Sequence, residues 1–265
     1  MYKRISSRQN NIIKQIRQAR ISKGKWARFA LAEGFRLCEE VLRAGLEIEA
    51  VLIDERLNLE ELAAYTTQAE ETYILDTELF AYVADTVNPQ GLMLVVRMPE
   101  NVSLNDLAKH LQDENGLIAE SSLLVLEQVQ DPGNLGTILR TAYAMGYDAA
   151  ILTANGAKPY QDKVLRAGMG ASFHLPIYEV QDSREVLHWL KENQIVSLAM
   201  ELNGTDLKNY KRSERIALWI GNEGNGLSNE VIQAAEEKLS IAMPGGAESL
   251  NAAVAAAIAI YEISR

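Results

Sequence analysis

The chain is organised around the stretch IALWIGNEGNGLS, residues 216–228. Five apolar residues, 216–220, are typical of a buried strand, and the pattern of 229–238 indicates a helix. Between them, three glycines in six residues allow positive φ angles and a close approach of the backbone to a ligand. Glu223 inside this loop disfavours a phosphate, because like charges repel, and favours a positive centre or a sugar hydroxyl. An ordinary strand-to-helix turn is the alternative for this loop taken alone.

The composition is that of a globular protein, because 48% of the residues are hydrophobic. The length of 265 residues is enough for two domains. Cys38 is the single cysteine, which excludes an intrachain disulfide and favours a reducing compartment. The three histidines are scattered and no cysteine cluster accompanies them, so we expect no metal site. No signal peptide and no run long enough for a membrane span is visible, and we expect a cytoplasmic protein.

The net charge of −10 conceals a basic N-terminal segment. Residues 1–32 contain no acid and nine basic residues: Lys3, Arg4, Arg8, Lys14, Arg17, Arg20, Lys23, Lys25 and Arg28. A basic segment on an otherwise acidic protein indicates a local anionic partner, and nucleic acid is the obvious candidate. A solvated helix face is the alternative.

The first hundred residues read as one alternating α/β domain, which we expect to fold separately and to bind RNA through the basic segment. Apolar spacing predicts helices at 10–19, 35–43, 57–69 and 77–84. Hydrophobic runs predict strands at 29–32, 48–53, 73–75 and 91–97.

A linker over residues 101–120 follows, with one helix at 104–111 that Ser103 and Asp106 start as a capping box. The second domain, 121–265, alternates strands and helices, which predicts a mostly parallel sheet covered on both faces. The predicted strands are 123–129, 149–152, 173–177, 195–200, 216–220 and 239–243. The predicted helices are 134–145, 161–169, 184–191, 229–238 and 249–265.

Three polar loops each follow a predicted strand of this second domain. They are DPGNLG at 131–136, the Gly221 loop, and PGGAESLN at 244–251. Ligands of open α/β sheets bind outside the carboxyl ends of the strands, where all three loops are able to meet. Each loop alone is weak evidence for a site, because turns and helix caps use the same residues. No GxGxxG, Walker or GxSxG motif is present, which disfavours a dinucleotide site, an NTP site and a serine hydrolase.

Together the three loops resemble the signature motifs of the SpoU (TrmH-like) RNA ribose 2′-O-methyltransferases of the SPOUT superfamily. The first motif matches Asn134-x-Gly136-x-x-x-Arg140 in DPGNLGTILRTAYAMG, the second matches IGNEGNGLS, and the third matches IAMPGGAESLNAAVA. DKVLRAGMGASFHLPI at 162–177 resembles the intervening helix and strand. FALAEGFRLCEEVLRAG at 29–45 resembles the start of a ribosomal-protein-like RNA-binding domain. The resemblance covers nearly the whole chain.

The resemblance implies a second domain whose C-terminal segment is threaded into a deep trefoil knot, and a homodimer. It also implies that the knot binds S-adenosylmethionine, whose sulfonium makes a nearby carboxylate electrostatically favourable. The implied cofactor-binding residues are Met200, Glu201, Leu202, Gly221, Gly224, Ile241 and Leu250.

By the same resemblance Arg140 is the base or activator for the ribose hydroxyl. A guanidinium stays protonated in proteins, so the alternative is that Arg140 holds the substrate phosphate and activates the hydroxyl electrostatically. The residues implied to position Arg140 and the ribose are Asn134, Glu223, Ser249 and Asn251. The implied RNA contacts are Arg17, Arg20, Lys23, Lys25 and Arg166.

The two-domain layout favours ribosomal RNA, most of all 23S, as the substrate by analogy. Three alternatives remain open: a transfer RNA substrate, a non-catalytic RNA-binding relative, and a different small-molecule enzyme on an α/β sheet. The complete polar set in the three loops disfavours the non-catalytic relative, and the missing nucleotide motifs disfavour the small-molecule enzyme.

Overall fold

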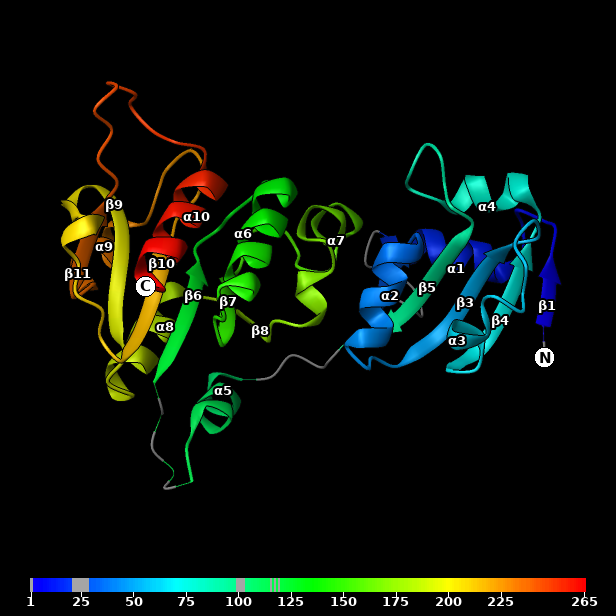
Figure 1. The fold of residues 1–265 in the computed structure, drawn as a ribbon, viewed down its shortest axis with the longest axis horizontal. Helices are drawn as coiled ribbons and strands as arrows, with labels where there is room; N and C mark the ends of the chain where they lie inside the picture. The colour runs from blue at the N-terminus through cyan, green and yellow to red at the C-terminus, as the bar shows by residue number, and fades with distance from the viewer. Residues whose placement is uncertain (1, 21–28, 99–102, 115, 117, 119) are drawn as a thin grey trace. The chain divides into compact units, whose positions relative to one another are not determined.

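The computed structural model describes residues 2–20, 29–98, 103–114, 116, 118 and 120–265, and the chain divides into two compact units (Figure 1). The first unit comprises Met1–Pro99 and Tyr160–Phe173, and the second comprises Glu100–Pro159 and His174–Arg265. The first unit therefore takes a segment from within the second half of the sequence. The domain bounds expected from the sequence left this segment in the second domain, 121–265.

The first unit is built on a mixed five-stranded sheet of order β1-β4-β3-β5-β2. Strands β1, β4 and β3 are parallel, and β5 runs antiparallel to both β3 and β2. The strands are β1 (Tyr2–Ile5), β2 (Phe29–Glu33), β3 (Ile48–Asp54), β4 (Ala69–Leu75) and β5 (Leu92–Arg97).

Successive strand residues point to opposite sides of this sheet, and helices cover the apolar side chains on both faces. The helices are α1 (Asn11–Arg20), α2 (Phe35–Arg43), α3 (Ala63–Thr66), α4 (Thr77–Val83) and α7 (Asp162–Gly168), followed by a 3₁₀ turn at Ala171–Phe173. On one face, Ile13 and Ile16 of α1 pack with Phe80 of α4. On the other, Val41 of α2 packs in one core with Leu165 of α7.

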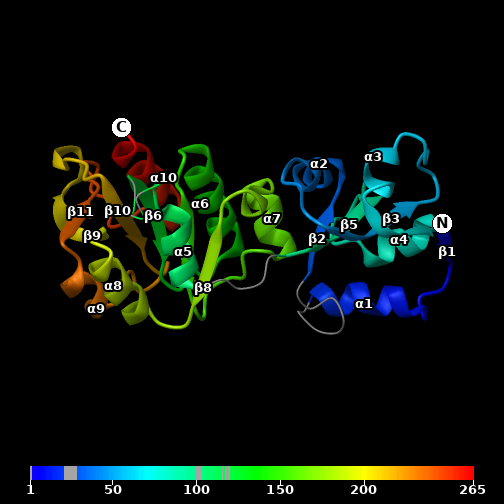
Figure 2. The same cartoon turned by 90° about the horizontal axis from the view of Figure 1, so that it is seen from below.

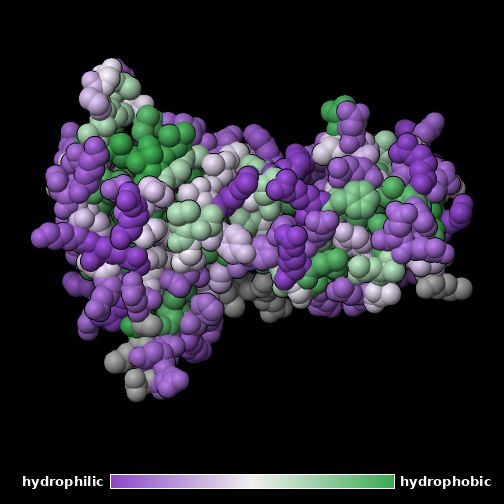
Figure 3. Space-filling model, viewed as in Figure 1, coloured by the Kyte–Doolittle hydropathy of each residue, from purple (hydrophilic) through white to green (hydrophobic). Residues whose placement is uncertain are grey.

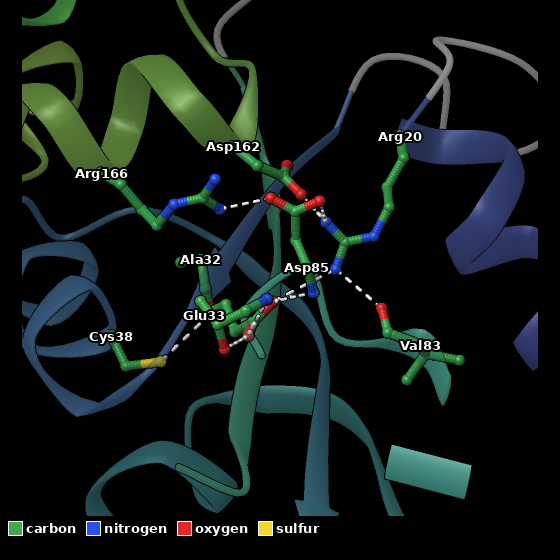
Figure 4. A network of polar contacts seen from close by, with 9 residues as sticks. Arg20, Ala32, Glu33, Cys38, Val83, Asp85, Asp162 and Arg166 are labelled. Carbon is green, nitrogen blue, oxygen red and sulfur yellow. Dashed lines mark hydrogen bonds and ion pairs between the residues drawn. The ribbon is translucent and has the colours of Figure 1, made fainter. Parts of the chain in front are cut away.

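A partly buried polar network also joins α1 to α7 within the first unit (Figure 4). Arg20, the last residue of α1, pairs with Glu33, Asp85 and Asp162. Arg166 of α7 pairs with the same Asp85 at 2.6 Å. The Glu33 carboxylate also accepts the backbone N–H of Asp85 at 2.7 Å, so every acid in the network has a donor. The segment that contains α7 is therefore held by ion pairs as well as by apolar packing.

The second unit is built on a six-stranded sheet of order β11-β9-β10-β6-β7-β8, in which every neighbouring pair is parallel. This confirms the predicted parallel sheet. The strands are β6 (Ser121–Leu126), β7 (Ala149–Thr153), β8 (Ile177–Val180), β9 (Val196–Asp206), β10 (Arg215–Ile220) and β11 (Glu237–Ser240).

Helices lie on both faces of this sheet too, with α6 and α10 on one side and α5, α8 and α9 on the other (Figure 2). The helices are α5 (Leu104–Leu111), α6 (Pro132–Ala144), α8 (Ser183–Glu192), α9 (Asn229–Ala234) and α10 (Ala252–Ile263), with a 3₁₀ turn at Leu207–Asn209. Leu107 of α5 and Trp189 of α8 share a core with Val125 of β6 and Trp219 of β10. The Ser103–Asp106 capping box of α5 is present as predicted. None of the helices in the described part of the chain is long and apolar enough to cross a membrane.

Three predicted helices are shorter in the structure. The helix predicted at 57–69 is only α3, because Asn58 accepts the N–H of Glu60 in a local turn and the residues from Ala69 pair with β3. The helix predicted at 229–238 ends at Ala234, since Glu237–Ser240 pair with β9 as an edge strand. The last helix begins at Ala252 rather than at 249, because Asn251 is its N-cap.

Two predicted strands were displaced and one was missed. At 173–177 the structure has a 3₁₀ turn and then β8, which begins only at Ile177 after Pro176. The strand predicted at 239–243 lies at Glu237–Ser240. Strand β1 was not predicted, because three of its four residues are exposed and carry no alternating apolar signal.

Candidate active site

The first polar loop begins helix α6 immediately after strand β6. The side chain of Asp131 caps this helix by accepting the N–H of Asn134 at 2.9 Å, and Pro132 fills the first helical position, where no N–H is needed. Asn134 is therefore held in the first turn of α6, at the carboxyl end of the sheet. Its side-chain amide remains free to bond to the other loops.

The second polar loop is a tight turn that closes on itself. Asn222 and Gly226 exchange two backbone hydrogen bonds of 3.0 and 2.9 Å, and Gly226 has a φ of +67°. A Cβ on Gly221 would lie only 2.2 Å from the carbonyl carbon of Gly226. Only glycine fits at position 221, as a loop that presents its backbone to a ligand requires.

Glu223 at the tip of the second loop binds the first loop. Its carboxylate accepts the backbone N–H groups of Gln130 and Asp131 and the side-chain amide of Asn134, each at 3.0 Å. The side-chain amide of Asn222 adds a bond of 2.9 Å to the carbonyl of Gln128. These four bonds fix the second loop against the first.

The third loop joins this pair through Asn251. Its side-chain amide donates to the Asn134 side-chain oxygen at 3.0 Å, while its own oxygen caps α10 by accepting the N–H groups of Ala253 and Val254. A hydrogen-bonded chain thus runs from Glu223 through Asn134 to Asn251. The structure brings one polar residue from each of the three loops together.

The same contacts determine the ionisation of Glu223. Burial by itself raises the pKa of this carboxyl, but the hydrogen bonds from Asn134, Gln130 and Asp131 outweigh it, and the net result is a lowered pKa. Glu223 is therefore a carboxylate at neutral pH with its lone pairs engaged. It suits a positioning role better than that of a proton acceptor.

Arg140 and Ser249 lie outside this chain of bonds. Arg140 is exposed on α6, between one and two turns beyond Asn134, and its guanidinium makes no ion pair with any residue that the structure describes. Its charge is available to a substrate. Ser249 is exposed two residues before Asn251, and the contact with Asn134 comes from Asn251.

The residues expected to bind the cofactor lie where β9 has passed the end of its pairing with β10, in the second loop, and after β11. Pairing of β9 with β10 ends at Ala199, so 200–202 follow at once. Leu202 is 66% exposed and Leu250 is 37% exposed, which is unusual for large apolar side chains. Glu201 and Ile241 are half-buried, and Gly224 is exposed in the second loop.

The residues expected to contact RNA have different surroundings. Arg17 is exposed on α1 and lies over the ring of Tyr82, with which it also shares a hydrogen bond. Arg20 and Arg166 belong to the ion network of the first unit, which occupies their guanidinium groups with carboxylates. Lys23 and Lys25 lie outside the described residues. No group of three potential metal ligands occurs in the part of the chain that the structure describes.

Two residues of this region were missed by the sequence analysis. Glu127 follows strand β6 directly and accepts hydrogen bonds from Ser183 and Ser228, and Asn222 links the second loop to Gln128. A carboxylate at the end of an otherwise apolar strand was the available signal for Glu127. Spacing alone gave no indication of its partners.

Comparison with known proteins agrees with this geometry. Residues 121–261 match the SpoU rRNA methylase family, and residues 10–94 match the MRM3-like substrate binding domain. The chain is 31% identical over 263 residues to the 23S rRNA (guanosine(2553)-2′-O)-methyltransferase RlmP of Bacillus subtilis, covering 98% of this chain and 99% of that one.

Solved structures give the same result. An AdoMet-bound rRNA methyltransferase from Sinorhizobium meliloti superposes with a TM-score of 0.84 at 28% identity, covering 99% of this chain and 97% of that one. The SpoU methyltransferase AviRb from Streptomyces viridochromogenes, in complex with AdoMet, gives 0.83 at 26% identity, with 97% and 98% covered. Fold and site thus define an RNA 2′-O-ribose methyltransferase. The chain belongs to the SpoU rRNA methylase family.

Proposed function

We propose that this protein transfers a methyl group from S-adenosylmethionine to a ribose 2′-hydroxyl of ribosomal RNA, with 23S RNA as the substrate. The observation that carries the proposal is the hydrogen-bonded chain Glu223–Asn134–Asn251, which assembles all three motif loops at one place. The Bacillus subtilis relative, which matches along nearly its whole length, acts on 23S rRNA by its name, and this supports the choice of substrate.

The residues expected to bind the cofactor fit its chemistry. Leu202 and Leu250 offer exposed apolar surface for an uncharged ring, and Gly221 is held in a tight turn against the backbone of Gly226. Glu201 and Glu223 supply negative charge near a cation. When bound, S-adenosylmethionine supplies an electrophilic methyl group on a positively charged sulfur.

Arg140 is the residue that acts on the RNA. Its exposed guanidinium binds the phosphate next to the target ribose and stabilises negative charge on the hydroxyl oxygen as the proton of that hydroxyl passes to solvent water. Asn134 and Asn251 orient the ribose, and Glu223 holds Asn134 in place. The catalytic effect of these residues is positioning and electrostatics.

The arrangement of domains and the knot belong to the same proposal. Residues 1–100 bind RNA, 101–120 link the two parts, and 121–265 carry out the transfer in the cytoplasm. After the edge strand β11 the chain returns to α10, which packs against α6. Threading of this returning segment past the Gly221 loop forms the trefoil knot, and it places the third loop beside the first two.

A homodimer completes the proposal. Apolar side chains gather over α10 (Figure 3), where Val254, Ile258 and Tyr261 are exposed at spacings of four and three residues along one face. A second copy of the chain is the partner that would cover this face, and the alanines of α10 allow its close approach.

The experiment that tests the proposed function is methyl transfer from labelled S-adenosylmethionine to purified ribosomal and transfer RNA, followed by mapping of ribose methylation in cells with and without the protein. Loss of one 2′-O-methyl group from 23S RNA is the expected result. Loss of a mark in transfer RNA alone would support the alternative substrate. RNA binding without any transfer would support the non-catalytic alternative.

A further inference from the structure

Glu127 is a buried carboxylate that the proposed chemistry does not use. It follows β6 directly and is only 7% exposed. Its side chain accepts three hydrogen bonds, from the hydroxyl of Ser183 at 2.6 Å and from the N–H and hydroxyl of Ser228 at 2.7 and 2.9 Å. Ser228 is the N-cap of α9 and the last residue of the Gly221 loop.

The same residue also binds the other end of that loop. The backbone N–H of Glu127 donates to the carbonyl of Ile220 at 2.9 Å, one residue before Gly221. The backbone of Glu127 therefore holds the entry of the loop, and its side chain holds the exit. Because Glu127 bonds to both ends of the loop, a displacement of its side chain changes the distance between Ile220 and Ser228.

We infer that Glu127 is a positioning residue for cofactor binding, which sets the conformation of the Gly221–Ser228 loop. The inference rests on the proposed function, in which this loop binds S-adenosylmethionine. The loop is narrow, since a Cβ on Gly221 would collide with the backbone of Gly226. A change in its span therefore moves the backbone groups that face the cofactor.

The contacts favour an acceptor with two oxygens at this position. All three groups facing the Glu127 side chain are donors, and a carboxylate accepts all of them. A glutamine in its place has one acceptor oxygen and no charge. If that oxygen accepts the N–H of Ser228, the NH₂ group faces the hydroxyls of Ser183 and Ser228, which then have to accept instead of donating. The negative charge also lies beside the N-terminus of α8, where the helix dipole favours it.

Loop-to-loop contacts divide the work between two carboxylates. Glu223 runs from the second loop to the first and holds Asn134, which faces the ribose. Glu127 follows strand β6, and its carboxylate holds Ser228 at the end of the second loop. Removing Glu127 should therefore weaken cofactor binding, whereas removing Glu223 should slow the methyl transfer step in addition to removing negative charge near the cofactor.

The test compares Glu127→Gln with the wild-type chain, using calorimetry with S-adenosylmethionine and single-turnover methyl transfer at saturating RNA and cofactor. Loss of a hydrogen bond to a charged group predicts a rise of about tenfold or more in the cofactor dissociation constant. The saturated rate should stay within about threefold of wild type, since Arg140 and Asn134 are untouched.

Asp148→Asn is the matched control. Asp148 accepts the backbone N–H of Ser122 at 2.7 Å, the same kind of bond at the opposite end of β6. Its replacement should leave the cofactor dissociation constant unchanged. Hydrogen exchange should rise in the loop of Glu127→Gln and not in that of Asp148→Asn, and this readout remains usable if the glutamine variant is partly unfolded.

Three results would overturn the inference: unchanged cofactor affinity in Glu127→Gln, an equal loss in Asp148→Asn, or a fall of the saturated rate without a change in affinity. A wild-type chain that binds no S-adenosylmethionine would refute the proposed function itself. The two failures are therefore distinguishable.

Discussion

Arg140 is the residue whose replacement tests the proposed chemistry most directly. Because its exposed charge is available to the substrate, Arg140→Ala should lower the single-turnover rate of methyl transfer by roughly two orders of magnitude or more. The dissociation constant for S-adenosylmethionine should change little, since that ligand is held by other residues. Rapid-quench assays with saturating RNA measure the rate, and calorimetry measures the binding.

Arg140→Lys separates charge from geometry. Lysine keeps the positive charge but loses the paired donors of the guanidinium, so strong rescue would indicate simple charge stabilisation. Arg184→Ala, on the opposite face of the sheet, is the control for losing an exposed arginine. A near-normal rate in Arg140→Ala would show that the catalytic residue is another one, in the three polar loops.

Glu223 makes the site sensitive to acid. Its pKa is lower in the folded protein than the ordinary value of 4.5, so its stabilising effect is complete above that value and is lost as the pH falls through the folded-state pKa. Glu223→Gln should therefore melt about 2–4 °C below wild type at pH 7, as expected for roughly 1 kcal/mol. The difference should shrink as the pH is lowered below 4.5 and through the folded-state pKa, and thermal melts across this range measure it. A difference that does not depend on pH would show that the charge of Glu223 contributes nothing.

At this scale the motif residues were predictable and most of their partners were not. The resemblance placed Asn134, Glu223 and Asn251 in one site, and the structure brings them into contact. That Glu223 reaches the backbone of Gln130 depends on how two loops separated by about ninety residues approach each other. Periodicity along the sequence carries no information about such a distance.

Helix α1 is the element for which we predict RNA binding. Its buried face carries Ile13, Ile16 and Ala19, which leaves Arg17 exposed. Replacing Arg17, Lys23 and Lys25 together with glutamine should weaken RNA binding and leave cofactor binding intact. Each lost phosphate contact should reduce the slope of log affinity against log salt by about 0.7, so the triple variant should be shallower by about 2. Unchanged affinity across a salt titration would exclude α1 and the segment after it from the interface.

Arg20 is the informative control for that experiment. Because it is held by Glu33, Asp85 and Asp162, Arg20→Gln should destabilise the first unit and have little direct effect on the salt slope. Burial of the guanidinium lowers the pKa of Arg20, against the opposing influence of the acids around it. These contacts indicate that the charge of Arg20 stabilises the fold of the first unit.

Elements were predictable where local signals were strong. Helices α2 and α5 have the predicted bounds, since apolar spacing and, in α5, a capping box define their ends. Predictions failed where tertiary pairing decided the structure. Residues from Ala69 onwards became part of β4, and Glu237–Ser240 became an edge strand, because each met a neighbouring strand with unpaired backbone groups.

The whole molecule is predicted to be a dimer through α10. Changing Val254 and Ile258 to lysine places four charges in a two-fold interface, because each residue occurs once in either subunit. The dimer dissociation constant should rise by about a hundredfold or more, the scale of losing central apolar contacts. Sedimentation at micromolar concentration should then show a monomer.

Val87→Lys is the matched control, since Val87 lies in the first unit with 95% of its surface exposed. It should sediment like wild type. If the α10 variant also remains dimeric, the partner surface lies elsewhere; if wild type is a monomer, the dimer itself is wrong.

The position of α7 in the first unit has a consequence for how the protein is made. A ribosome releases the chain from its N-terminus, so Leu165 and Phe173 appear only after β6 and β7 have been synthesised. Until then, the face of the first sheet that carries α2 lacks part of its apolar cover. The first unit therefore completes its core while the second unit is already emerging, and the folding of the two is interleaved in time even though their sheets are separate.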